Sequence, residues 1–150
     1  MIKIKEALCK QCQEFLDTKI RVLQLNISDL EAGLQSETKS SAGDKHETGR
    51  AMLQLEREKL GQQLAEIQKQ QQVLNKISPK HEHQKIALGS VVKTTNFNYF
   101  ISISIGEIYY EDELYYAISS STPIAKLILS KTEEDTITFK DNTFDIVSVH

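Results

Sequence analysis

The sequence predicts an α+β protein, in which a long antiparallel α-helical coiled-coil hairpin precedes a small antiparallel sheet domain with one short helix. Two stretches in the first half carry apolar residues at heptad spacing. A polar, proline-containing stretch that begins at Ser78 ends this periodicity, and the later spacing alternates as in strands. The predicted boundaries are a hairpin over residues 1–77, a linker over 78–86 and the sheet domain over 87–150.

Composition narrows the classes of protein to consider. Hydrophobic residues make up 39% of the 150 residues, which fits a chain that spends many residues on a solvated coiled coil. The net charge of -3 gives no overall field for nucleic acid or an anionic membrane, so we expect neither direct DNA binding nor membrane binding. No secretory signal or membrane-spanning run is evident, and two cysteines do not suggest a secreted disulfide framework. We therefore expect a cytoplasmic protein.

The two heptad seams predict where the hairpin turns. The spacing of the first seam alternates between four and three residues, over Leu16, Ile20, Leu23, Ile27, Leu30 and Leu34. The second seam contains Leu53, Leu60, Leu64, Ile67 and Leu74, with Arg57 and Gln71 at its weak positions. Facing positions of an antiparallel hairpin have residue numbers with a constant sum, and the two seams match at 87. The turn then falls between Gly43 and Asp44, which predicts a tip at about residues 40–47.

The length of the arm needs a reason, because a two-helix seam buries little apolar surface. Residues 9–43 would span roughly 50 Å as a helix. Reach toward a distant site is one explanation, and a dimerisation coiled coil or a spacer is the other, since heptads alone specify no partner.

The second half reads as strands, turns and one short helix. Predicted strands lie at residues 89–94, 99–105, 114–119, 136–139 and 144–149. Ile and Ser alternate towards the end of 99–105, which predicts one buried and one solvated face. Turns are predicted at 111–113 and 140–143. Thr122 is a good N-cap and Pro123 suits the first helical position, which predicts a helix over 122–129.

The C-terminal half resembles the globular domain of the bacterial Gre transcript-cleavage factors, which bind RNA polymerase. The matching residues are Leu88–Val92, Ser119–Lys126, Ile128, Lys131, Glu134, Asp135 and Phe144–Val149. Thr122 stands where the family usually has Ser, and Ser130 stands where it usually has Gly. The resemblance implies a C-terminal fold like that of the FK506-binding proline isomerases (FKBP-like).

The hairpin tip carries the second part of the resemblance. Gre factors have a coiled-coil hairpin that ends in a Gly-Asp-x-x-Glu tip, and here Gly43, Asp44 and Glu47 fall at the calculated turn. The chain departs from the family at Thr48, where Asn is usual, and at Ala51, where an aromatic residue is usual.

The resemblance implies a transcription elongation factor that inserts its hairpin into the secondary channel of bacterial RNA polymerase. Asp44 and Glu47 would help to hold a catalytic Mg²⁺ shared with the polymerase near the nascent RNA 3′ end, so that the polymerase cleaves backtracked RNA. Mg²⁺ prefers oxygen ligands and often takes one or two carboxylates from a protein. Ser121, Thr122 and Pro123 are the implied docking residues. The chain alone is expected to be no enzyme and to hold no metal or cofactor.

Three alternatives remain open from the sequence. Asp44 and Glu47 also fit an N-cap and its capping box, so the tip can simply finish a helix. A channel-binding regulator or inhibitor would keep the docking without the cleavage. A coiled-coil adaptor unrelated to polymerase would need neither the docking nor the cleavage.

Cys9 and Cys12 suggest one further, weaker site. The hairpin register places residue 9 opposite 78, near His81 and His83, so a zinc site at the base of the arm is conceivable. The His-x-His spacing is unusual for such a site, and inert thiols at the edge of the seam are the simpler interpretation.

Overall fold

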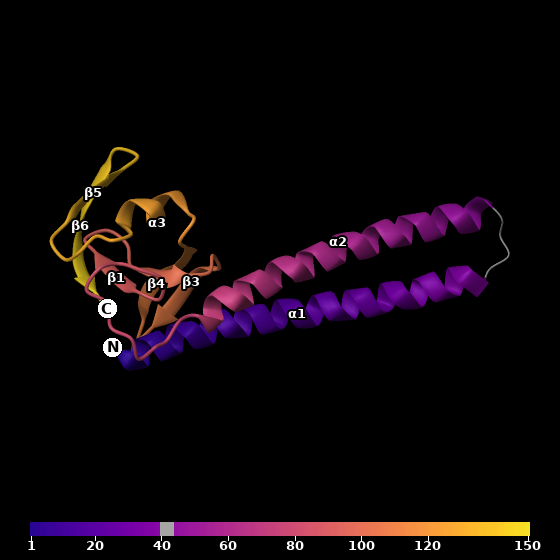
Figure 1. The fold of residues 1–150 in the computed structure, drawn as a ribbon, viewed down its shortest axis with the longest axis horizontal. Coiled ribbons are helices and arrows are strands. Elements are labelled where there is room, and N and C mark those ends of the chain that lie inside the picture. The colour runs from indigo at the N-terminus through magenta and orange to yellow at the C-terminus, as the bar shows by residue number, and fades with distance from the viewer. Residues whose placement is uncertain (40–43) are drawn as a thin grey trace. The chain divides into compact units, whose positions relative to one another are not determined.

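The computed structural model describes residues 1–39 and 44–150, without the side chains of residues 37–39 and 44–47. Within this part of the chain the elements follow the predicted α+β order (Figure 1). They are α1 (Ile2–Lys39), α2 (Asp44–Asn75), β1 (Val91–Thr94), β2 (Tyr99–Ser102), β3 (Gly106–Tyr110), β4 (Glu113–Ser119), α3 (Pro123–Ile128), β5 (Thr136–Phe139) and β6 (Asn142–Val149).

The chain divides into two compact units. One unit is the segment Leu16–Gln70, which holds most of α1 and α2. The other combines Met1–Phe15 with Gln71–His150, so the first turns of α1 belong with the sheet. No helix among the described residues is long and apolar enough to cross a membrane.

The hairpin of α1 and α2 has the predicted seam on its inner face. Leu16, Leu23, Leu60 and Ile67 are buried, whereas exposed positions flank them on both helices. Arg57, at a weak position of the seam, donates from Nε and Nη2 to Glu31 Oε1 at 3.2 and 2.9 Å. This pair has residue numbers that sum to 88. The packing of Leu53 beside Gly33 gives 86, so both contacts agree with the predicted register within one residue.

The six-stranded sheet is mixed, which corrects the prediction of an antiparallel sheet. Among the described residues the strand order is β3-β4-β2-β1-β6-β5, and β2 pairs with β4 in parallel. The chain reverses direction from β2 into β3 and again into β4, and β4 then lies between the two earlier strands. Two reversals leave β2 and β4 pointing the same way, while the other pairings are antiparallel.

The prediction of a solvated face for residues 99–105 is wrong over β2. All four residues of β2 are buried, and Ser102 is only 1% exposed. The Ser102 hydroxyl lies 3.8 Å from Cys12 Sγ on α1. Because alternate residues of a strand point to opposite faces, α1 covers the face that carries Ser102. A hydroxyl here is tolerated because the thiol is a polar partner.

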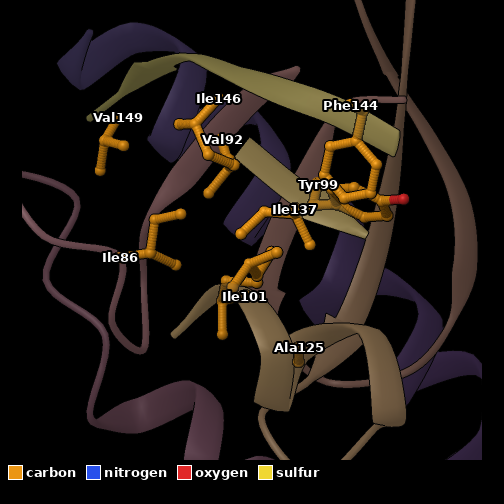
Figure 2. Close-up of a cluster of buried hydrophobic side chains, with 10 residues drawn as sticks. Ile86, Val92, Tyr99, Ile101, Ala125, Ile137, Phe144, Ile146 and Val149 are labelled. Atoms are coloured by element: carbon orange, nitrogen blue, oxygen red, sulfur yellow. The ribbon is translucent and has the colours of Figure 1, made fainter. Parts of the chain in front are cut away.

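The opposite face of the sheet is covered by α3 and forms the main core. Figure 2 shows side chains from β1, β2, β5, β6, α3 and the segment before β1 that gather there. They are Ile86, Val92, Tyr99, Ile101, Ala125, Ile128, Ile137, Phe144, Ile146 and Val149. The sheet is therefore the middle layer between α3 and the start of α1.

Two tight turns have backbone angles that usually favour glycine or asparagine. Lys140 and Asp141 join β5 to β6 with φ of 49° and 67°, and Glu111 and Asp112 join β3 to β4 with φ of 49° and 65°. Positive φ at both central residues defines a type I′ hairpin turn. The turns predicted at 140–143 and 111–113 are present but shorter, since β6 already begins at Asn142 and β4 at Glu113. The second turn was predicted to lie between strands, but no bounds were predicted for β3.

We predict that Gly61→Ala stabilises the hairpin by about 1 kcal/mol, the difference in helix propensity between the two residues. Gly61 lies inside α2, and an added Cβ would meet nothing within 4 Å. Thermal unfolding followed by circular dichroism at 222 nm measures the effect. Gly89→Ala is the contrasting variant and should destabilise, because Gly89 has φ +91° and its Cβ would lie 3.1 Å from Ile77 Cγ2. A lower melting temperature for Gly61→Ala would contradict the prediction.

Candidate functional site

The acidic tip residues belong to the first turn of α2. α2 begins at Asp44, within the predicted tip, and Glu47 follows three residues later. Residues 40–43, and the side chains of Asp44 and Glu47, lie outside the described part of the structure. Residues three apart on a helix lie on the same side, so the backbone is compatible with a joint role for the two carboxylates. Thr48 and Ala51, at the positions where the sequence departs from the Gre pattern, are exposed on α2.

The three predicted docking residues lie together at the start of α3. Thr122 is the N-cap: its Oγ1 accepts a hydrogen bond from Ala125 N at 3.3 Å and donates one to Ser119 O at 2.9 Å. Pro123 occupies the first helical position, where its missing N–H costs nothing. Ser121 Oγ lies 2.9 Å from Ser119 Oγ. Hydrogen bonds thus fix the loop that presents Ser121 and Pro123 to solvent.

The exposed side of α3 continues this surface. Leu127 is 41% exposed and Lys126 is exposed, whereas Ala125 and Ile128 are buried on the opposite side of the helix. The surface is therefore mixed: two hydroxyls and a proline at the helix start, followed by one cation and one apolar side chain. The hydrogen-bond partners of the two hydroxyls are Ser119 and Ala125, and neither is a base that would activate a nucleophile.

Cys9, Cys12, His81 and His83 do not come together as a metal site. Cys12 is fully buried beside Ser102, and burial raises the pKa of its thiol to about 11, which opposes the thiolate that a metal requires. Within residues 1–39 and 44–150 no group of three or more His, Cys, Asp or Glu side chains is placed to hold a metal ion. The zinc interpretation therefore has no support in the geometry.

Lys5 is a buried residue that the sequence did not identify. Its side chain is fully buried, and Nζ donates to the backbone carbonyl of His81 and lies 3.3 Å from His83 Nδ1. Lysine is almost never fully buried without such partners, so its residue type alone predicts the surface. Its place one residue after the buried Ile4 gives no signal in the sequence, because consecutive residues of a helix point to different sides.

Gln11 is the second residue that sequence reasoning missed. Its side-chain amide donates to Tyr109 O at 2.6 Å, and its Oε1 accepts from Tyr109 N at 3.0 Å. Tyr109 belongs to β3, which is an edge strand, so Gln11 satisfies two backbone groups that would otherwise be open. A glutamine on a helix carries no sequence signal for this contact.

The chain is similar to a solved structure described as "Structure of the transcription factor Gfh1". The two share 16% sequence identity, the match covers 91% of this chain and 92% of that chain, and the TM-score is 0.35. No protein-family model matches the chain, and no curated protein matches it.

We predict that Thr122→Ala lowers the free energy of unfolding by about 1 kcal/mol, the usual value of an N-cap side chain. The alanine leaves Ala125 N without its acceptor, so the start of α3 loses its support. Ser121→Ala is the matched control and should change stability by less than about 0.5 kcal/mol, because Ser121 is exposed. Chemical denaturation of both variants measures the difference, and equal stabilities would contradict the assigned cap.

Proposed function

We propose that this protein is a Gre-like transcription elongation factor that binds bacterial RNA polymerase and stimulates cleavage of backtracked RNA by the polymerase. The α3 surface docks on the polymerase, and the hairpin enters the secondary channel with Asp44 and Glu47 leading. The chain itself is not an enzyme, since it lends carboxylates to a partner that already catalyses the hydrolysis.

One observation carries this proposal. The Gly-Asp-x-x-Glu motif coincides with the boundary at which α2 begins, after a helix of 38 residues. At 1.5 Å per residue α1 is roughly 57 Å long, which is more than a cap for a local helix requires. A tip that assists a metal is useful only where a long arm delivers it, so the motif and the arm support each other.

The residue types at the tip fit a shared Mg²⁺. Carboxylate oxygens are its preferred protein ligands, and a second metal in a phosphoryl-transfer site stabilises the attacking and leaving oxygens. Asp44 and Glu47 supply two carboxylates within one helical turn, too few for a complete site. The remaining ligands would therefore come from the polymerase and the RNA.

The geometry beyond α3 also supports the Gre resemblance. Ser130 stands where Gre factors usually have Gly, and its φ is 69°. Glycine is favoured in this left-handed region because other residues place Cβ too close to the backbone. The backbone at this position thus has the conformation that the family's glycine would select.

We predict that Asp44→Asn and Glu47→Gln each slow factor-stimulated cleavage by roughly 10- to 100-fold, the usual effect of losing a supporting group at a metal site. RNA length in a reconstituted backtracked bacterial elongation complex, followed at saturating factor, measures the rate. Glu58→Gln is the matched control, since Glu58 is an exposed carboxylate farther along α2, and it should leave cleavage unchanged.

The same assay separates the alternatives. Binding without cleavage by the unmodified protein would favour a channel-binding regulator. The observation that motivates this alternative is that Thr48 and Ala51 stand at the family's usual Asn and aromatic positions. No binding at micromolar concentration would contradict both the cleavage factor and the channel-binding regulator, and it would favour a coiled-coil adaptor.

We predict that Ser121→Arg raises the Kd for the polymerase by at least about tenfold, equivalent to 1.4 kcal/mol, because a large charge is introduced into the docking surface. Fluorescence anisotropy of labelled factor titrated with core polymerase measures the affinity. Asn96→Arg adds the same side chain to an exposed loop between β1 and β2, and should bind as the unmodified protein does. An unchanged Kd for Ser121→Arg would contradict the assigned surface, and equal loss in both variants would mean that the added charge acts without regard to position.

A further inference from the structure

The ammonium of Lys5 joins the first turns of α1 to the segment between α2 and β1. Lys5 has no solvent exposure, so water does not compensate for lost partners. Its Nζ donates to His81 O and contacts His83 Nδ1 at 3.3 Å. Two residues of one short segment are therefore held by a single buried cation.

This contact requires one protonation state of His83. A lysine ammonium has three donors and no acceptor, so Nδ1 of His83 must offer its lone pair. The ring is then neutral, with its proton on Nε2. If His83 gained a second proton, two cations would face each other at 3.3 Å beside a buried backbone, and the contact would become repulsive.

We propose that Lys5 and His83 form a proton-controlled latch: the latch holds residues 81–83 against α1 at neutral pH and opens when His83 is protonated. The segment is tethered at its far end, where Ile86 N donates to Lys131 O and Ser130 N donates to Ile86 O. Opening is thus confined to the residues between the end of α2 and Ile86. This device is independent of the cleavage proposal.

The groups around the latch include some that lower the pKa of His83 and some that raise it. Cys9 on α1 and His81 on the segment also face this site, and Glu82 lies there with its Oε2 3.7 Å from Nδ1 of His150, which follows β6. Burial lowers the pKa of His83, and Lys5 and His81 lower it further, whereas a backbone hydrogen bond with His150 and the Glu82 carboxylate raise it. Burial likewise lowers the pKa of Lys5.

The sign of the pH dependence follows from these shifts. A histidine with a folded-state pKa below its unfolded value of about 6.5 binds fewer protons when the latch is closed than when it is open. The closed state is therefore favoured fully above about pH 6.5 and loses this advantage as the pH falls towards the folded-state pKa.

Hydrogen exchange on the full-length protein tests the latch. Between pH 7.5 and 5.5 the protection factors of the amides in residues 81–85, among them His81 N, which donates to Ser78 O at 3.1 Å, should fall by up to about tenfold after correction for intrinsic rates, the limit for one histidine of normal open-state pKa. His83→Gln should remove this pH dependence. His81→Gln makes the same substitution at the neighbouring exposed histidine and should keep the pH dependence.

A second readout distinguishes a charge effect from simple packing. The NMR titration of the His83 ring should shift to higher pH in Lys5→Met, which removes the cation and keeps an unbranched apolar side chain. Equal pH dependence in the unmodified protein and His83→Gln, or an unchanged His83 titration in Lys5→Met, would overturn the proposal.

Discussion

Burial of the first turns of α1 against one face of the sheet is the constraint on which the rest of the structure depends. Leu8 and Cys12 are fully buried and Ile4 is 4% exposed, and each of the two aliphatic side chains is worth about 2 kcal/mol of hydrophobic stabilisation. The sheet has no solvated face over β2 because this helix covers it. A small domain gains a second core layer in this way, which a sheet of this size otherwise lacks.

The same burial brings two further contacts of the first turns of α1 into the sheet unit. Gln11 completes the hydrogen bonding of the β3 edge, and Lys5 secures the segment that leads from α2 to β1. The loop proposed to dock lies at the start of α3 on the opposite face of the same sheet. One unit therefore carries both the proposed partner-binding surface and the beginning of the arm.

The sequence was sufficient wherever a local pattern decided the structure. Alternating spacings of four and three located the seam and, through the register, predicted a turn just before the residue at which α2 begins, Asp44. Thr122 as N-cap and Pro123 at the first helical position predicted α3. The pattern failed where a distant segment decided burial: the Ser102 side looks solvated until α1 covers it. Four buried residues at the start of α1 are spaced by four: Ile4, Leu8, Cys12 and Leu16. Four residues advance a helix by more than a full turn, so this stripe winds around α1 and does not follow the alternating spacing of the seam. The roles of Lys5 and Gln11 depend on contacts between segments far apart in the sequence, and no local period encodes them.

The central claim is that the start of α2 reaches the RNA 3′ end inside the polymerase. Site-specific photocrosslinking tests this most directly, with a photoreactive residue at position 45 and RNA labelled at its 3′ end in a backtracked complex. A photoreactive residue at position 59, an exposed site about 21 Å farther along α2, is the matched control. The account predicts label transfer from position 45 and little from position 59. Equal transfer from both positions, or none from either, would contradict it.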